Sequence, residues 1–129
     1  LVSNQLKDKT ILVVDDSAVI KKFIQSIFNN KYNVVEATDG NQAIKIINSN
    51  QYNISSMLLD LNMPNVNGFQ VLEYFKQNNL FNKINITIIT GIGSDDIISK
   101  AKTYPINGII LKPFNERDIK NAVEKDELI

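Results

Sequence analysis

Side chains able to do chemistry stand at the ends of apolar runs in this sequence, and Asp60 is the clearest of them. It follows Met57-Leu58-Leu59, and Pro64 a few residues later prevents the run from continuing as a strand. An apolar run of this kind is typical of a strand buried on both faces of a parallel sheet, where ligands bind outside the carboxyl ends of the strands. A single aspartate in such a place is more often a loop cap than a nucleophile. The interpretation of Asp60 therefore depends on the other strands.

Three further runs of apolar and β-branched residues end in a carboxylate, a hydroxyl or an ammonium group. Parallel strands place their carboxyl ends at one edge of a sheet, so these side chains are expected to meet Asp60 there. A helix cap explains one acidic residue after the first run, since either Asp16 or Ser17 can accept from free backbone N–H groups, but it does not explain two. The positions are Asp15 and Asp16 after residues 10–14, Thr90 at the end of residues 84–90, and Lys112 after residues 108–111.

The composition restricts the available chemistry to carboxylates, hydroxyls and lysine. The 129 residues include no cysteine and no histidine, which excludes thiol nucleophiles, imidazole bases and the usual zinc ligands. Any metal is therefore expected to be hard and bound by oxygen. Lys and Arg together number 14, as do Asp and Glu, and this neutrality argues against nucleic acid and an anionic membrane surface as direct partners.

The length predicts a single domain over residues 1–129, with a core of ordinary proportions. No apolar run approaches the length of a membrane span, and residues 1–9 are polar rather than signal-like, so a cytoplasmic location is expected. The first residue is Leu1 and not methionine, which indicates a trimmed chain or one excised from a longer protein.

The elements that must position these side chains are strands alternating with helices, and the periodicity of the sequence predicts this alternation. Helical periodicity follows each strand-like run, and Pro105 ends the helix before the last strand near Tyr104. Five βα units fill the chain, which predicts a doubly wound parallel sheet of the α/β class. Strands are expected at residues 10–14, 32–37, 54–60, 84–90 and 108–111, and helices at 19–28, 43–47, 69–75, 97–101 and from a cap at Asn115 to Val123.

The strand-end residues, joined by the spacing Asp60-x-x-Met63-Pro64-x-x-x-Gly68, resemble the receiver domain of two-component response regulators over about residues 10–125. In that family an acidic pair follows the first strand, an aspartate ends the third, a serine or threonine ends the fourth, and Lys-Pro follows the fifth. All of these are present here. The resemblance implies a flavodoxin-like, three-layer (βα)5 fold with a five-stranded sheet in the order 2-1-3-4-5.

This resemblance implies a signalling phosphoacceptor that accepts a phosphoryl group on Asp60 from a sensor histidine kinase or a phosphotransfer protein. It implies no enzyme acting on other substrates, because such a domain catalyses only its own phosphotransfer and autodephosphorylation. Thr90 and Lys112 are implied to bind phosphoryl oxygens, and phosphorylation is expected on Asp60 alone. The implied ligands of Mg²⁺, for which Mn²⁺ can substitute, are Asp15, Asp16, Asp60 and the backbone carbonyl of Asn62.

Electrostatics supports these implications. Three carboxylates about 4 Å apart repel each other by up to roughly 4 kcal/mol per pair at an effective dielectric constant near 20. Such a cluster needs a cation, and Mg²⁺ prefers oxygen ligands in octahedral geometry. Because water attacks an acyl phosphate, its lifetime is expected to depend on Asn62 and Ile92, which flank the site.

Two departures from the family pattern concern how a signal leaves the site. The family usually has an aromatic residue three positions before the lysine, where this chain has Ile109, and often a glycine seven positions before it, where this chain has Pro105. A switch by aromatic rotation is thus not expected, and Thr90 is expected to draw in the loop that follows it. The resemblance implies an output domain or partner on the surface of the fourth helix, fifth strand and fifth helix. It also allows a phosphorylation-linked homodimer, and it implies a cis bond between Lys112 and Pro113.

Three other interpretations compete with this one. A haloacid dehalogenase-like phosphatase also uses a strand-end aspartate with Mg²⁺, but its usual second acid two residues later is Asn62 here. A flavodoxin-like mononucleotide binder fits the sheet, but Asp15 and Asp16 in the first turn would repel phosphate. A pseudo-receiver that acts only as an interaction module usually lacks an acid or the lysine, and this chain lacks neither.

Overall fold

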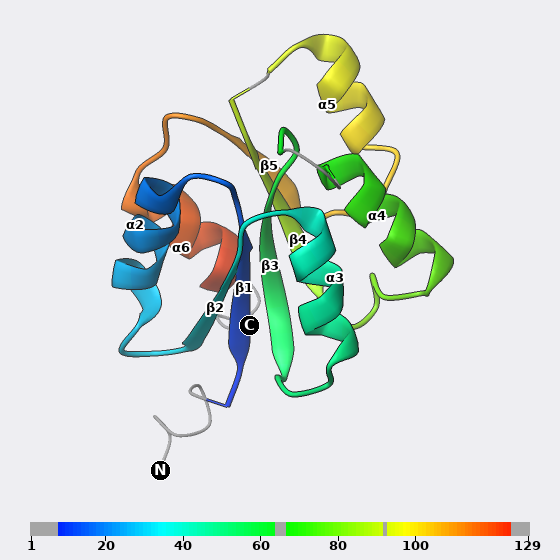
Figure 1. Ribbon diagram of the computed structural model, residues 1–129. Coiled ribbons are helices and arrows are strands. Elements are labelled where there is room, and N and C mark those ends of the chain that lie inside the picture. The colour runs from blue at the N-terminus through cyan, green and yellow to red at the C-terminus, as the bar shows by residue number, and fades with distance from the viewer. Residues whose placement is uncertain (1–7, 64–66, 92, 125–129) are drawn as a thin grey trace.

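The computed structural model describes residues 8–63, 67–91 and 93–124, and in these ranges strands and helices alternate along the chain (Figure 1). The positions of the expected elements are confirmed, with ends that differ by a few residues. Pro64 lies outside the described residues, and the strand before it ends at Asp60. The elements are β1 (Thr10–Val14), α2 (Ala18–Phe28), β2 (Asn33–Ala37), α3 (Gly40–Asn48), β3 (Ile54–Asp60), α4 (Gly68–Gln77), β4 (Asn85–Thr90), α5 (Asp95–Ala101), β5 (Gly108–Leu111) and α6 (Glu116–Glu124).

The strands form a parallel sheet in the order β2-β1-β3-β4-β5, which confirms the predicted fold class and strand order. Residues paired across the sheet set the level at which each strand ends. Val14 pairs with Leu59, Asp60 pairs with Ile89, and Thr90 pairs with Leu111. The residues that follow β1, β3, β4 and β5 are therefore brought to the same edge of the sheet.

Helices cover both faces of the sheet, α2 and α6 on one face and α3, α4 and α5 on the other (Figure 1). Alternate strand residues supply the two cores, because successive side chains of a strand point to opposite faces. Leu58 packs with Ile24 of α2 and Ile119 of α6, whereas Leu59 packs with Phe75 of α4. The strand β3 is buried from Ser56 to Asp60, as its apolar run predicts. No helix in the described ranges is long and apolar enough to cross a membrane.

Ser17 caps α2, and this leaves the acidic pair before it without a capping role. The Ser17 Oγ accepts a hydrogen bond from the Ile20 N–H at 3.3 Å, and the backbone of Ser17 is extended as an N-cap requires. Of the two caps that the sequence allowed, the serine is therefore the one used. The N-cap of α2 therefore does not account for Asp15 and Asp16, which follow β1 at the edge of the sheet.

Candidate functional site

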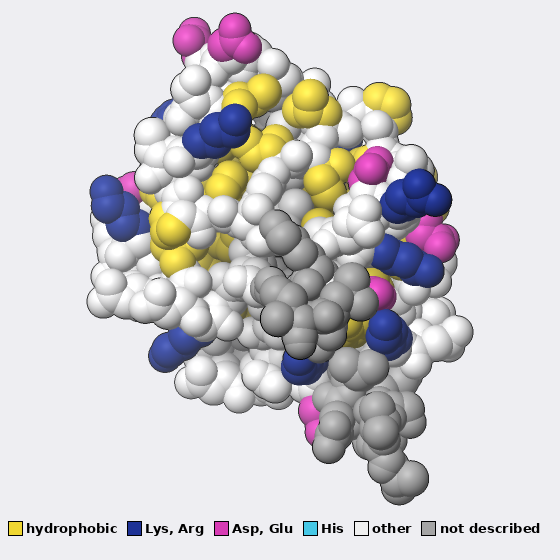
Figure 2. Space-filling model, turned by 180° about the vertical axis from the view of Figure 1, so that it is seen from behind, with side chains coloured by type: hydrophobic (Ala, Val, Ile, Leu, Met, Phe, Trp, Pro, Cys, Tyr) yellow, Lys and Arg dark blue, Asp and Glu magenta, His cyan; other side chains and the backbone are white. Residues whose placement is uncertain are grey.

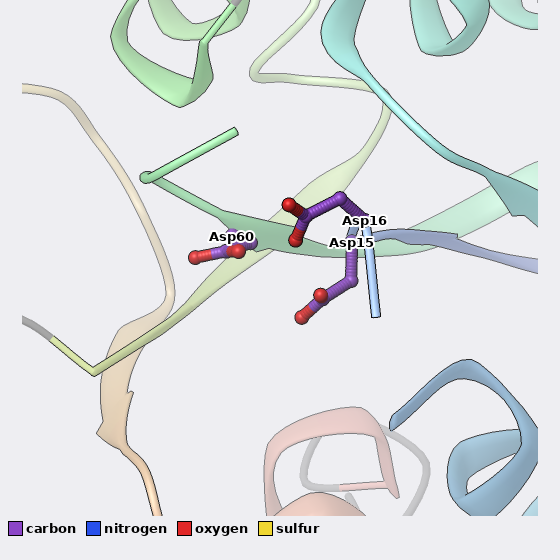
Figure 3. Close-up of side chains that lie close together, drawn as sticks. All are labelled: Asp15, Asp16 and Asp60. Carbon is purple, nitrogen blue, oxygen red and sulfur yellow. The ribbon is translucent and has the colours of Figure 1, made fainter. Parts of the chain in front are cut away.

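Three carboxylates converge at the carboxyl edge of the sheet, as the sequence predicts. Asp15 and Asp16 directly follow β1, and Asp60 is the last residue of β3; Figure 3 shows the three side chains close together. One oxygen of each lies within 4.8 Å of the others. Asp15 and Asp60 are buried, whereas Asp16 is exposed. The cluster is thus open to solvent on the side of Asp16.

Lys112 reaches this cluster from the end of β5 and joins its two buried members. The Lys112 Nζ lies 3.1 Å from Asp15 Oδ2 and 3.6 Å from Asp60 Oδ2. The positive charge of Lys112 is thus shared among a cluster of three carboxylates. The peptide bond between Lys112 and Pro113 is cis, as predicted.

Backbone N–H groups hold one oxygen of each buried carboxylate. The Ser17 N–H donates to Asp15 Oδ1 at 2.8 Å, and the Asn62 N–H donates to Asp60 Oδ1 at 3.2 Å. The other oxygen of Asp15 is fully buried and accepts no hydrogen bond, although Lys112 lies close to it. The Lys112 ammonium compensates the charge of this oxygen but is shared with Asp60. This oxygen is the kind of atom that a bound cation satisfies.

The pKa of Asp60 is raised above its ordinary value, chiefly because burial disfavours the charged form. The negative charges of Asp15 and Asp16 raise it further. The hydrogen bond from the Asn62 N–H and the charge of Lys112 lower the pKa without cancelling the rise. The charged carboxylate of Asp60 is therefore under-compensated by the protein alone.

Thr90 stands at the same edge, at the end of β4 and fully buried. Its carbonyl accepts a hydrogen bond from the Lys112 N–H at 2.9 Å, which ties the ends of β4 and β5 together. Its strand neighbour Ile89 pairs with Asp60. All the candidate side chains thus gather at one edge of the sheet, and Asn62 lies there as an exposed residue. Ile92, expected to flank the site, lies outside the described residues.

Gly68 is a supporting residue whose importance the sequence shows only as a spacing. It begins α4, and its N–H donates to the Leu61 carbonyl at 3.3 Å. A Cβ atom at this position would lie 2.6 Å from both the Asp60 carbonyl oxygen and the Leu61 Cα. Only glycine allows the start of α4 to approach the backbone of Asp60 so closely.

Replacing Gly68 with alanine is expected to destabilise the protein by about 1–3 kcal/mol, because backbone atoms must move to admit the methyl group. The displacement falls on the backbone of Asp60 and Leu61. Gly108→Ala is the matched control, since a Cβ there meets nothing within 4 Å. Chemical denaturation measures the stability of both variants. Equal stabilities would contradict the close approach at Gly68.

The residues of the site fit a hard divalent cation such as Mg²⁺ or Mn²⁺. All the side chains that converge with Asp60 on the acidic side offer oxygen, the donor that such cations prefer. The Lys112 ammonium is shared between Asp15 and Asp60, and the raised pKa of Asp60 indicates that its negative charge is not fully compensated. A cation among these three carboxylates would supply the missing compensation.

Comparisons with a family model, with curated proteins and with solved structures agree on the family that this chain resembles. The family model described as "Response regulator receiver domain" matches residues 11–124. The chain is 26% identical to chemotaxis protein CheY of Pseudomonas aeruginosa, over 89% of this chain and 93% of that protein. It is 29% identical to sporulation initiation phosphotransferase F of Bacillus subtilis, over 93% of this chain and 94% of that protein.

A third relative is much longer than this chain. The CAI-1 autoinducer sensor kinase/phosphatase CqsS of Vibrio cholerae is 34% identical over 90% of this chain but only 17% of its own length. Among solved structures, the receiver domain of a Francisella response regulator is 26% identical, with a TM-score of 0.78 over 90% of this chain and 93% of that one. Chemotaxis protein CheY4 of Vibrio cholerae is 23% identical and shares the fold, with a TM-score of 0.79 over 91% of this chain and 97% of that one.

Proposed function

Because the chain belongs to the response regulator receiver domains of two-component systems, whose general function is to accept a phosphoryl group, we propose that Asp60 is its phosphoacceptor. One observation carries the proposal. Asp60 is a buried carboxylate at the carboxyl edge of a parallel sheet, with Asp15 and Asp16 on one side and the Lys112 ammonium 3.6 Å away. Asp15 is also buried and close to Lys112, but Asp60 is the residue that ends the third strand, where the family has its phosphoaccepting aspartate.

In the proposed reaction, an Asp60 carboxylate oxygen attacks the phosphorus atom of the donor. A bond forms between this oxygen and phosphorus, and the bond from phosphorus to the leaving group breaks, so that its electron pair departs with the leaving group. Lys112 is placed to bind a phosphoryl oxygen as a compact positive charge. The Thr90 hydroxyl is proposed to donate to another oxygen of the same group.

The proposed holders of a divalent cation are Asp15, Asp16, Asp60 and the backbone carbonyl of Asn62. When bound, Mg²⁺ would neutralise the negative charge that develops on the transferred phosphoryl group. The buried carboxylates are held ready for this by the Ser17 and Asn62 N–H groups. Autodephosphorylation is part of the proposal, with Asn62 and Ile92 setting the access of water to the acyl phosphate.

The experiment that tests the function is a titration with Mg²⁺ and a small phosphodonor such as acetyl phosphate. We expect a mass gain of one phosphoryl group that is lost in acid, as an acyl phosphate is. A phosphatase would turn the donor over without a lasting mass gain, and a nucleotide binder or a pure interaction module would show neither. Absence of any mass gain at saturating metal and donor would contradict the proposal.

The proposed donor in the cell is a sensor histidine kinase or a phosphotransfer protein. The curated relatives support this, because one is named as a phosphotransferase and another as a sensor kinase. The proposed output surface, for another domain, a protein partner or a phosphorylation-linked homodimer, comprises α5, β5 and α6. Figure 2 shows hydrophobic side chains gathered on the α5 side of the molecule, where a recess of about 440 Å³ is lined by residues including Ile98, Tyr104, Ile109 and Leu111.

The helix α5 is the part of this surface best placed to respond. Ala101 is its buried residue, and Ile97 and Ile98 are half-buried. It also contacts α4, where the Lys100 Nζ lies 4.3 Å from the centre of the Phe69 ring. Just after α5, the Tyr104 hydroxyl donates to Glu73 Oε2 at 2.9 Å. We expect these contacts between α5 and α4 to rearrange when the end of β4 moves.

Loading the site with beryllofluoride, which mimics a phosphoryl group, is expected to slow hydrogen exchange about tenfold in residues 91–105. The reason is that Thr90 would gain a charge-assisted hydrogen bond and draw the following loop inward. Ile109 is smaller than the usual aromatic and stiff at χ1, so it should report less. Asp60→Asn, which cannot take up the mimic in the same way, is the control. Equal changes in all helices, or changes only around Ile109, would contradict this route.

A further inference from the structure

Among the helices of the described ranges, α5 buries the fewest residues. Ala101 is its one buried residue, whereas each of the other helices buries at least two. Residues 93–96, which lead from β4 into α5 and begin it, are exposed. A helix that buries so little apolar surface gains little stability from packing on the sheet. The position of α5 therefore depends on the side chains that join it to its neighbours.

Two contacts hold the carboxyl-terminal end of α5 against α4, which lies beside it (Figure 1). The Tyr104 hydroxyl donates to Glu73 Oε2 at 2.9 Å, and the Lys100 Nζ lies 4.3 Å from the centre of the Phe69 ring. Each contact involves a charged group, and a charge-assisted hydrogen bond is about twice as strong as a neutral one. We call these two contacts the α4–α5 clasp.

The partners in the clasp are placed so that both contacts form together. Phe69 and Glu73 are four residues apart on α4 and so lie on one face of that helix. The pKa of Tyr104 is raised above its ordinary value, because burial disfavours the phenolate and Glu73 accepts a hydrogen bond from the hydroxyl. The hydroxyl therefore keeps its proton and donates to Glu73 at neutral pH.

The clasp and the phosphoacceptor site act on opposite ends of α5. The route proposed above draws the exposed segment 93–96 inward, and this segment begins the helix. A helix of seven residues is a stiff element about 10 Å long, so a displacement of its first turn is passed to its last. The hydrogen bond of Tyr104 is lost when its length grows beyond about 3.5 Å. The clasp must therefore break before α5 can follow the loop.

We infer that the α4–α5 clasp is an autoinhibitory contact, which holds α5 in its unphosphorylated position and so opposes occupation of the site by a phosphoryl group. This inference rests on the phosphoacceptor function proposed for Asp60 and adds a regulatory contact to it. A contact made only in the unoccupied state weakens binding by the factor by which it favours that state. Removing the clasp must therefore strengthen binding at Asp60. A contact that only supports the fold has no such effect.

The test measures the apparent Kd of beryllofluoride by calorimetric titration in Mg²⁺ and excess fluoride. Tyr104→Phe keeps the ring, which lies 6.3 Å from the ring of Phe81, and removes the hydrogen bond to Glu73. It is expected to lower the apparent Kd about two- to tenfold. Lys100→Met keeps an apolar side chain of similar length and removes the charge over Phe69. It is expected to lower the apparent Kd about two- to threefold.

Each variant has a matched control on the same pair of helices. Tyr74→Phe also removes a tyrosine hydrogen bond from α4, but this bond runs to Asn48 Oδ1 of α3, at 2.7 Å. Lys102→Met removes the same charge as Lys100→Met from an exposed position at the C-cap of α5. Any long-range effect of this charge on an anion at the site is thus matched. Both controls should bind beryllofluoride like the parent.

The outcomes separate the autoinhibitory role from the acceptor function. An apparent Kd that is unchanged or raised in Tyr104→Phe and Lys100→Met, or lowered equally in the two controls, overturns the autoinhibitory role and leaves the acceptor function intact. A parent protein that binds beryllofluoride no better than Asp60→Asn does overturns the proposed function, and the autoinhibitory role with it.

Discussion

Asp60→Asn is expected to abolish phosphorylation, with the rate falling by at least about 10⁴-fold, the scale seen when a nucleophile is removed from an active site. The amide keeps the shape of the carboxylate but offers no nucleophilic oxygen. Its neighbours remain, Lys112 to bind a phosphoryl oxygen and Asp15 to hold the cation. The measurement is the intact mass of the protein after incubation with acetyl phosphate and Mg²⁺, followed by peptide mapping of the labelled residue in the parent.

Asp95→Asn is the control for this substitution, because Asp95 is an exposed aspartate in the first turn of α5, away from the acidic cluster. It should be phosphorylated like the parent. A phosphoryl group on Thr90 or Ser94 in the parent, or continued labelling of the Asp60→Asn variant, would contradict the assignment of the acceptor.

Asp60→Asn is also expected to raise the melting temperature of the protein in metal-free solution at neutral pH. The pKa of Asp60 is raised in the folded protein, so the folded state binds its proton more tightly than the unfolded state does. Stability from this group is fully present below the ordinary aspartate pKa and is lost as pH rises through the raised value. The gain in melting temperature over the parent should thus be larger at neutral pH than near that ordinary pKa, and a gain independent of pH would contradict the sign.

The sequence predicts the residues at the edge of the sheet better than it predicts the residues around them. Asp60, Thr90 and Lys112 interrupt apolar runs, and parallel strands must bring such interruptions to one edge, so their meeting could be predicted from pattern alone. The strand order could not, because alternating strands and helices predict a parallel sheet but not which strands are neighbours. It came from the family resemblance, and the structure confirms it.

The residues around the site were harder to predict, because their role depends on distances between elements. Phe23 fits the apolar periodicity of a core-facing helix, yet it is 38% exposed since Ile24 and Phe28 already fill the contact with the sheet. Gly68 is visible in the sequence only as part of a spacing. Its need to lack a side chain appears when α4 is seen to start against the backbone of Asp60 and Leu61.

Asp16→Asn is expected to abolish the stabilisation of the protein by Mg²⁺. A ligand that binds only the folded state stabilises it by about 1.4 kcal/mol at ten times its Kd, so the parent should melt several degrees higher in Mg²⁺. Asp16 is exposed, so its replacement leaves the buried part of the site intact while removing one of the three carboxylates that converge. Asp95→Asn again serves as an exposed control, and it should keep the full response to Mg²⁺.

The response to Mg²⁺ also has a predicted pH dependence that distinguishes this site from a surface cluster. Protons compete with the cation for Asp60, and because the pKa of this carboxyl is raised, they do so at a higher pH than at an ordinary aspartate. The Mg²⁺-dependent rise in melting temperature should therefore shrink as pH falls through that raised value, before exposed aspartates begin to titrate. A parent indifferent to Mg²⁺ at neutral pH would show the metal assignment to be wrong. A full response that persists in Asp16→Asn would show that Asp16 is not a ligand of the cation.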